Sequence, residues 1–294
     1  MREFFSVFAP LRLCVFALLF FVPVTAQNVA VLSPDRSETS RSFAEKLEGA
    51  LGKSLRVIDS GMSEAAFLSA KTENTFNLTT DAAKAIGSAI GCDFFLLVNS
   101  ATSRRSSSQR DEYYESHAAI HAVSSRSGRL IFWRLLRFEE QKPDAAQNLL
   151  DDAVNDLASQ IVHQLKLTIR TEMTEPPRAA MEEPPDDNSP AAKNFKAPIP
   201  YRRIKPDYTA DAFLYDVRAT VDIIVDLARD GAILRTEIVR WAGYGLDESV
   251  EKAVRAMKWR PAMRDGKPLS MRFLLRYNFK EIQKGHSEQM KTRR

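Results

Sequence analysis

The sequence predicts a two-domain protein of mixed α/β and α+β class. We expect an N-terminal α/β sandwich-like domain, a proline-rich linker, and a small C-terminal three-stranded antiparallel sheet with one packed helix. A chain of 294 residues, 44% hydrophobic and 27% charged, has room for about two globular domains. After position 217, apolar residues alternate with polar ones, which is the period of a strand with one buried face. Between residues 171 and 200, paired prolines and acidic residues interrupt the apolar pattern.

Residues 1–26 have the features of an export signal. Arg2 and Arg12 are positive, Leu13–Val22 is an unbroken apolar run, and the small residues before position 27 fit a cleavage site. The run is shorter than the roughly 20 residues that span a bilayer. We therefore expect cleavage after Ala26 and a periplasmic protein of a Gram-negative-type bacterium. An uncleaved inner-membrane anchor is the alternative.

Residues 27–170 predict the α/β domain. A short buried strand, NVAVLSP, precedes a helix over 37–52, and a helix over 80–91 leads into an apolar strand over 93–100. A polar loop is expected over 101–111. Two strands, 113–124 and 130–138, then form a hairpin, and one long amphipathic helix is expected over 144–169. This order, with LTTDAAKAIGSAIGCDFFLLVNS and SRSGRL, resembles the TolB amino-terminal and CsgG-like periplasmic domains, which implies a role in envelope assembly and protein contact.

The linker and the ends of the chain differ in charge. Residues 171–200 carry three basic and six acidic residues, and TEPPRAAMEEPPDDNSP offers little to bury, so an extended, hydrated segment is expected. Residues 201–294 carry 20 basic and 13 acidic residues. The C-terminal domain, 201–280, is thus a basic module that suits acidic protein faces. The tail 281–294 is polar and is predicted to be disordered.

The C-terminal domain begins with two strands and a helix. Val217–Arg229 alternates, Asp230-Gly231 supplies hairpin chemistry, and Ala232–Trp241 returns beside the first strand. The period then changes to that of a helix, with Asp247 expected as the N-cap. The apolar stripe of this helix consists of Leu246, Val250, Ala253, Val254 and Met257. Pro261 ends it.

Leu269–Phe279 is predicted as the third strand. Met271, Phe273, Leu275, Tyr277 and Phe279 would face the core, and Ser270, Arg272, Leu274, Arg276 and Asn278 would face outward. If this strand lies at the sheet edge, its free backbone groups could accept a partner strand, and the two arginines would attract acidic partners. Basic residues on an edge strand equally serve to prevent aggregation.

Several spaced motifs in residues 205–280 resemble the C-terminal domain of the TonB family. They are KPDYTADAF, VDLARDGAI, LDESVEKAVRAMKWRPA and DGKPLSMRFLLRYNF, although Thr209 and Ala219 depart from the family pattern. The resemblance implies that this domain binds a short extended segment of outer-membrane transporters by strand addition. By position, the implied partner-binding residues are Tyr208, Arg272, Leu274, Arg276 and Asn278. The implied structural signature is Asp230, Gly231, Trp259, Pro261 and Gly266, in which Trp259 and Pro261 hold the helix end against the sheet.

The sequence contains few features of a catalytic or cofactor-binding site. No phosphate-binding glycine loop, dinucleotide fingerprint or nucleophile elbow occurs. His117 and His121 would share a strand face with Glu115, but no third strong ligand follows at a zinc-like spacing, so we expect no metal. Cys92 is expected to be a small core residue. We therefore expect no enzyme, no cofactor, no nucleic-acid partner and no small-molecule substrate.

The leading functional hypothesis is a periplasmic protein in transmembrane transport, whose C-terminal module engages an outer-membrane transporter or another envelope protein. Inner-membrane motor proteins would be partners only if residues 1–26 remain as an anchor. TonB proteins that harness the proton gradient keep a His on their membrane helix, and no His precedes His117 here. An envelope scaffold or assembly factor without energy transduction is the alternative.

Overall fold

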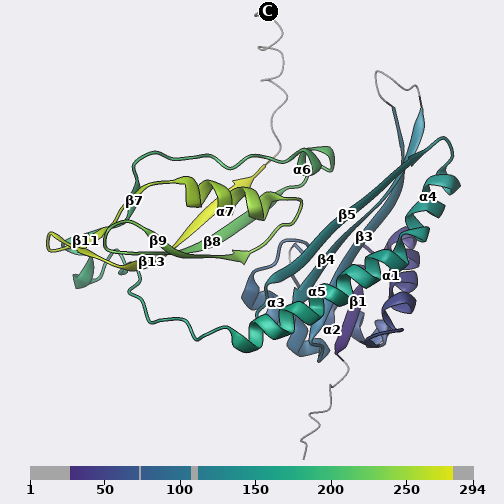
Figure 1. Cartoon of the computed structure of the whole chain (residues 1–294), viewed down its shortest axis with the longest axis horizontal. Coiled ribbons are helices and arrows are strands. Elements are labelled where there is room, and N and C mark those ends of the chain that lie inside the picture. Colours follow the sequence, from purple (N-terminus) through teal and green to yellow (C-terminus); the bar gives the residue numbers. More distant parts are fainter. Residues whose placement is uncertain (1–26, 73, 107–111, 281–294) are drawn as a thin grey trace, which may run out of the picture.

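The computed structural model describes residues 27–72, 74–106 and 112–280, and they form a mixed α+β structure built on two main sheets (Figure 1). The signal expected at 1–26 and the tail expected at 281–294 lie outside these residues. Within the described part of the chain, none of the helices combines the length and the apolar character needed to cross a bilayer.

The first sheet has five strands in the order β2-β1-β3-β4-β5. The β1–β2 and β1–β3 pairs are parallel, and the β3–β4 and β4–β5 pairs are antiparallel. The strands are β1 (Asn28–Leu32), β2 (Arg56–Val57), β3 (Phe94–Arg105), β4 (Tyr113–Ser124) and β5 (Leu130–Glu140). The expected hairpin is confirmed. The loop expected over 101–111 is wrong in its first half, because β3 continues to Arg105 in register with Tyr113.

Helices cover both faces of this sheet. They are α1 (Glu38–Leu51), α2 (Ser60–Ser69), α3 (Thr80–Ile90), α4 (Pro143–Asp152) and α5 (Val154–Thr174). One core lies between the sheet and α1, α4 and α5. The opposite core lies under α2 and α3 and contains Cys92. The long helix expected over 144–169 is in fact two helices, which meet at Ala153, and α5 continues to Thr174.

The C-terminal sheet has the strand order β13-β8-β9 and is wholly antiparallel. Its strands are β8 (Ala219–Leu227), β9 (Ile233–Arg240) and β13 (Met271–Phe279), and α7 (Leu246–Ala256) covers one face. The core between them includes Val221, Ile223 and Val225 together with Val250 and Val254. The predicted three-stranded sheet with one packed helix is confirmed.

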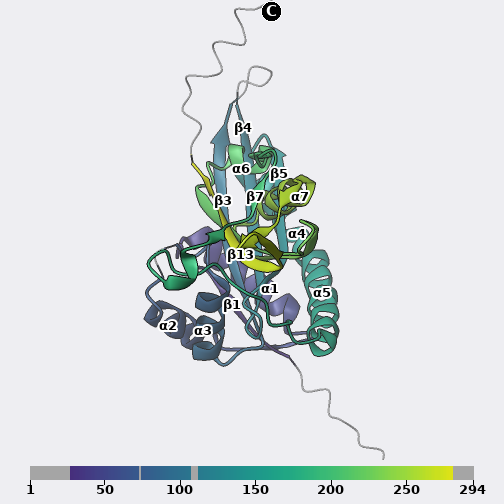
Figure 2. The same ribbon diagram turned by 90° about the vertical axis from the view of Figure 1, so that its left-hand side faces the viewer.

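Short elements precede β8 and also lie between α7 and β13. They are η1 (Pro190–Ala192), β6 (Phe195–Lys196), β7 (Ile199–Pro200), α6 (Ala210–Leu214), β10 (Trp259–Arg260), β11 (Ala262–Arg264) and β12 (Lys267–Leu269). The segment expected to be a hydrated linker is partly ordered against the C-terminal part, because β6 pairs with β11 and β7 pairs with β10. Seen from the left-hand side of Figure 1, β13 and α7 lie in front of the first sheet (Figure 2).

Candidate functional site

The outer edge of β13 is the candidate partner-binding site. β13 pairs with β8 along its whole length, from Met271 opposite Leu227 to Phe279 opposite Ala219. Because β8 lies between β13 and β9, the other side of β13 is an edge of the sheet. Such an edge presents backbone donors and acceptors that another strand can use.

The direction of the backbone groups along this edge follows from one hydrogen bond. The Arg272 N–H donates to the carbonyl oxygen of Glu182 at 2.8 Å, on the side away from β8. In an antiparallel ladder, alternate residues direct both backbone groups to the same side. The N–H and C=O groups of Leu274, Arg276 and Asn278 therefore also point to the outer edge, where the Glu182–Met271 bridge is the one pairing found among the described residues.

The two edge arginines are paired within the sheet. Arg272 makes two hydrogen bonds to Asp226, at 2.7 and 2.8 Å, and Arg276 makes two to Asp222, at 2.7 and 2.9 Å. Each pair consists of directly opposite residues on β13 and β8. These partners largely neutralise the charge that was expected to attract a binding partner, and sequence spacing alone did not reveal them.

Asp222 also accepts a hydrogen bond from Arg240 of β9 at 3.1 Å. Burial opposes ionisation of this carboxyl group, but the guanidinium groups of Arg276 and Arg240 outweigh burial and hold the pKa of Asp222 below its usual value. The carboxylate thus joins all three strands on the face opposite α7.

The other implied binding residues differ in how far their side chains are free to contact a partner. Leu274 is 51% exposed. Asn278 accepts a hydrogen bond from the Thr220 hydroxyl at 2.8 Å. The hydroxyl of Tyr208 lies within hydrogen-bond distance of the Ala212 and Val217 carbonyl oxygens, and its ring stacks on Phe279. Tyr208 therefore holds the segment before β8 in place.

The residues of the implied signature lie in turns or in the core, except Pro261. Gly231 has a φ of +87°, and a Cβ there would lie 2.2 Å from the Trp259 carbonyl oxygen, so only glycine fits. Trp259 is 4% exposed and packs edge-on against Phe273. Asp230 accepts a hydrogen bond from the Ala232 N–H in the same hairpin, Pro261 follows β10, and Gly266 has a φ of +77° in the turn before β12.

Asp247 is not the N-cap of α7, as the sequence predicted. That position is Gly245, and Asp247 lies in the first turn. Its carboxylate accepts hydrogen bonds from the Ala242 and Gly243 N–H groups, at 3.0 and 2.8 Å. Burial raises the pKa of Asp247 to about 7. The side chain thus fixes the loop before α7 rather than the end of the helix.

The loop before α7, residues 241–245, contacts the first sheet. The sequence did not predict this contact. Trp241 is 1% exposed and packs in the core beneath α2 and α3, with Phe95 and Val123. Asn77 bonds to three backbone groups of the C-terminal part, namely the Thr220 N–H and carbonyl and the Trp241 carbonyl. An apolar aromatic residue at the end of a strand gives no sign in the sequence of which core it enters.

His117 and His121 do share a face of β4, as predicted, and that face meets the C-terminal part. His121 is fully buried, and its Nε2 lies 3.3 Å from the Ala242 carbonyl oxygen. The Tyr215 hydroxyl donates to Glu115 at 3.2 Å, and its ring lies against His117. Among the described residues there is no group of three side chains that could hold a metal ion.

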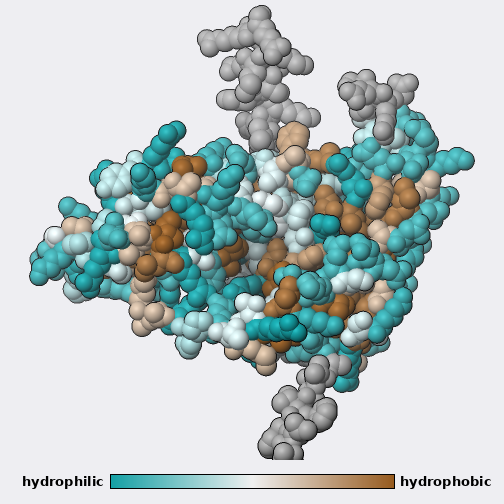
Figure 3. Space-filling view, in the orientation of Figure 1, coloured by the Kyte–Doolittle hydropathy of each residue, from teal (hydrophilic) through white to brown (hydrophobic). Residues whose placement is uncertain are grey.

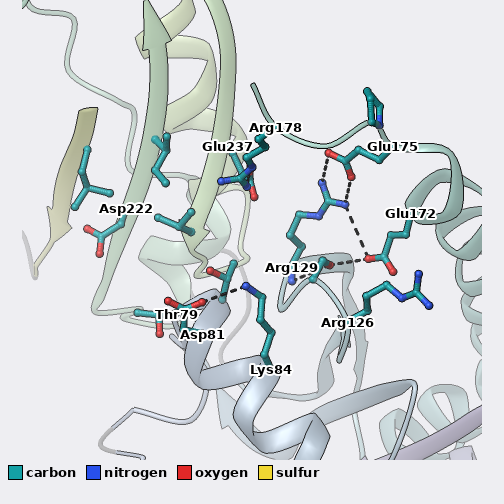
Figure 4. A pocket seen from close by; sticks show the side chains of 16 residues that line it. Thr79, Asp81, Lys84, Arg126, Arg129, Glu172, Glu175, Arg178, Asp222 and Glu237 are labelled. Carbon is teal, nitrogen blue, oxygen red and sulfur yellow. Dashed lines mark hydrogen bonds and ion pairs between the residues drawn. The ribbon is translucent and has the colours of Figure 1, made fainter. Parts of the chain in front are cut away.

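A cleft of about 620 Å³ lies between the sheets (Figure 4). Arg129 lies between Glu175 and Glu172, and Lys84 is beside Asp81. Apolar walls come from Ile224, Val239 and Leu274. The face shown in Figure 3 is largely hydrophilic, with apolar side chains in several separate patches. Through Leu274, the cleft is continuous with the β13 edge.

Comparison with known proteins identifies the C-terminal part. Residues 204–280 match the family described as Gram-negative bacterial TonB protein C-terminal, which confirms the TonB-type C-terminal domain that the sequence predicted. No curated protein matches the chain.

Similar solved structures include lipoprotein GNA1162 from Neisseria meningitidis, with 18% identity, 47% of this chain and 99% of that chain covered, and a TM-score of 0.33. The LpoB C-terminal domain from Salmonella enterica has 15% identity, covers 41% and 87% of the two chains, and gives a TM-score of 0.26. At these scores the likeness carries no functional conclusion.

Proposed function

We propose that this protein is a non-catalytic periplasmic envelope protein whose TonB-type module binds an extended segment of an outer-membrane transporter, or of another envelope protein, by strand addition at β13. The binding residues would be Leu274, Arg276 and Asn278, with Arg272 at one end of the edge. Tyr208 contributes indirectly, by holding the segment before β8. In this proposal the module serves transport across the envelope.

One observation carries the proposal. The N–H and C=O groups at Leu274, Arg276 and Asn278 point away from β8, at the outer side of a strand that ends its sheet. A partner strand would gain main-chain hydrogen bonds there, and its alternate side chains would give specificity. Since Arg276 is already paired with Asp222, the backbone supplies most of the affinity.

Site-specific photo-crosslinking in Gram-negative cells tests this proposal. A photoreactive side chain at Leu274 on β13 should form adducts with outer-membrane proteins. The matched control is Leu234 on β9, at the opposite edge of the same sheet, where exposure is similar at 60% against 51%. Equal adducts at both positions, or adducts at Leu234 alone, would contradict binding at β13.

A second candidate, an envelope scaffold without energy transduction, is favoured by the buried Trp241 contact. A module that is anchored in the core of the first sheet is not free at the end of a tether. Cell fractionation with N-terminal sequencing separates the two candidates. A soluble periplasmic protein that starts at Gln27 would exclude direct coupling to an inner-membrane motor and leave the scaffold, whereas a retained N-terminal anchor would support coupling.

A further inference from the structure

The segment that follows α5 crosses the C-terminal sheet and reaches the β13 edge. Figure 1 shows it leaving α5 and passing to the C-terminal part. Its first contact is Glu175, which pairs with Arg129 of the first sheet and with Arg235 of β9. Next, Arg178 pairs with Glu237, also on β9. These ion pairs hold the segment against the sheet face opposite α7, and the segment then places Glu182 beside β13.

Glu182 occupies the start of the edge through its backbone and its side chain. Its carbonyl oxygen accepts the outward Arg272 N–H at 2.8 Å, as part of a parallel bridge with Met271. Its carboxylate pairs with Arg264 of β11. The pKa of Arg272 is raised above its ordinary value, chiefly by its hydrogen bonds to Asp226 and to a smaller extent by the nearby charge of Glu183. An acidic, extended piece of this chain thus already binds where a partner strand would add.

We propose that this place is a docking subsite for acidic extended segments that run parallel to β13, and that the chain's own Glu182 is its resident occupant. The inference rests on the proposed function and specifies the partner. A strand that pairs with the full edge must displace Glu182, and it carries an acidic residue at the position that meets Arg264.

The resident contact is weak enough to be displaced. It consists of a backbone pairing one residue long, which includes the Arg272 N–H bond, and one partly exposed ion pair, with side-chain exposures of 32% for Arg264 and 43% for Glu182. Exposed ion pairs contribute little to stability. The occupant is nevertheless tethered on both sides, by Glu175 and by the β6–β11 pairing, so it rebinds at a high effective concentration. A competing segment therefore needs further contacts beyond Arg272, which the edge offers.

Amide hydrogen exchange of Arg272 in the full chain tests the subsite, because this N–H bonds to Glu182 itself. Glu182→Arg should speed its exchange about tenfold, the loss expected for one hydrogen bond. The charge swap Glu182→Arg with Arg264→Glu should restore slow exchange. Asp187→Arg makes the same charge change elsewhere in the linker and should leave Arg272 unaffected.

The acidic preference is tested with peptides added to the Glu182→Arg chain at about 1 mM, comparable with the effective concentration of a tethered segment. A peptide of residues 178–187 should slow the exchange of Arg272 and Leu274. Its counterpart with Glu182→Lys and Glu183→Lys should not.

Unchanged Arg272 exchange in Glu182→Arg, or equal protection by both peptides, would overturn the inference. These measurements need no envelope partner. Failure of crosslinking at Leu274 together with peptide protection would therefore reject the proposed function and leave the subsite standing.

Discussion

The indole Nε1 of Trp241 donates a hydrogen bond to the Gly128 carbonyl oxygen at 3.1 Å. Trp241 directly follows β9 of the C-terminal sheet, and Gly128 lies in the β4–β5 turn of the first sheet. The bond and the buried ring join two sheets that the sequence pattern presents as separate domains. The orientation of the β13 edge relative to the first sheet depends on this anchor.

Replacing Trp241 should therefore destabilise the whole molecule. Trp241→Ala removes a large side chain from a packed core and should lower the free energy of unfolding by about 3–5 kcal/mol. Trp241→Phe keeps most of the packing and loses the indole donor, so about 1 kcal/mol is expected. Urea denaturation followed by circular dichroism measures both. Equal stabilities for the Ala variant and the native chain would refute the anchor.

Gly243 should be intolerant of a side chain because of the neighbouring sheet. Its φ is +71°, and a Cβ would lie 2.5 Å from Trp133 and 2.7 Å from His121. Gly266 has a similar φ of +77° with nothing within 4 Å, so it is a matched control for backbone strain. Gly266→Ala should cost about 1 kcal/mol. Gly243→Ala should cost about 1–3 kcal/mol more, from overpacking. If both variants lost the same free energy of unfolding, Trp133 and His121 would be moving aside at no cost.

His121 should make the contact between the sheets sensitive to acid. Burial lowers the pKa of His121 from 6.5 to about 4, so the folded protein keeps the ring neutral while the unfolded chain protonates it. With a lowered folded pKa, the contribution of this residue is fully present above about pH 6.5 and is lost as pH falls towards 4. At pH 5 the loss is about 2 kcal/mol.

His121→Gln keeps an amide donor for the Ala242 carbonyl oxygen and does not titrate. The difference in unfolding free energy between pH 7 and pH 5 should therefore be about 2 kcal/mol smaller in this variant than in the native chain. An identical pH dependence in the two proteins would mean that His121 is solvated in solution.

Local pattern predicted the C-terminal sheet well, because its strands and α7 each bury one face and carry the matching period. The inward residues Met271 and Phe273 are buried, and the outward Leu274 is exposed. Hairpin chemistry at Gly231 likewise required no tertiary information. These features depend on residues close in sequence, which is why periodicity and turn chemistry suffice.

The features that the sequence did not predict depend on how the strands align and on how the two sheets pack together. The pairing of Arg272 with Asp226 joins residues 46 positions apart and requires the alignment of β13 with β8. To predict the role of Asp247 one must know the fold of loop 241–245. To predict the position of Glu182 one must know the path of the linker over the sheet. Each is a long-range relationship that one sequence without its structure leaves open.

The most direct test of strand addition is the affinity of the full chain for a periplasmic segment of an outer-membrane transporter, compared between Leu274→Pro and Leu274→Ala. Proline removes the outward N–H of Leu274 without removing a donor from the β8 ladder, whereas alanine removes only the side chain. We predict that Leu274→Pro weakens binding about tenfold or more, and that Leu274→Ala keeps most of it. A folded Leu274→Pro variant with native affinity would contradict strand addition at β13.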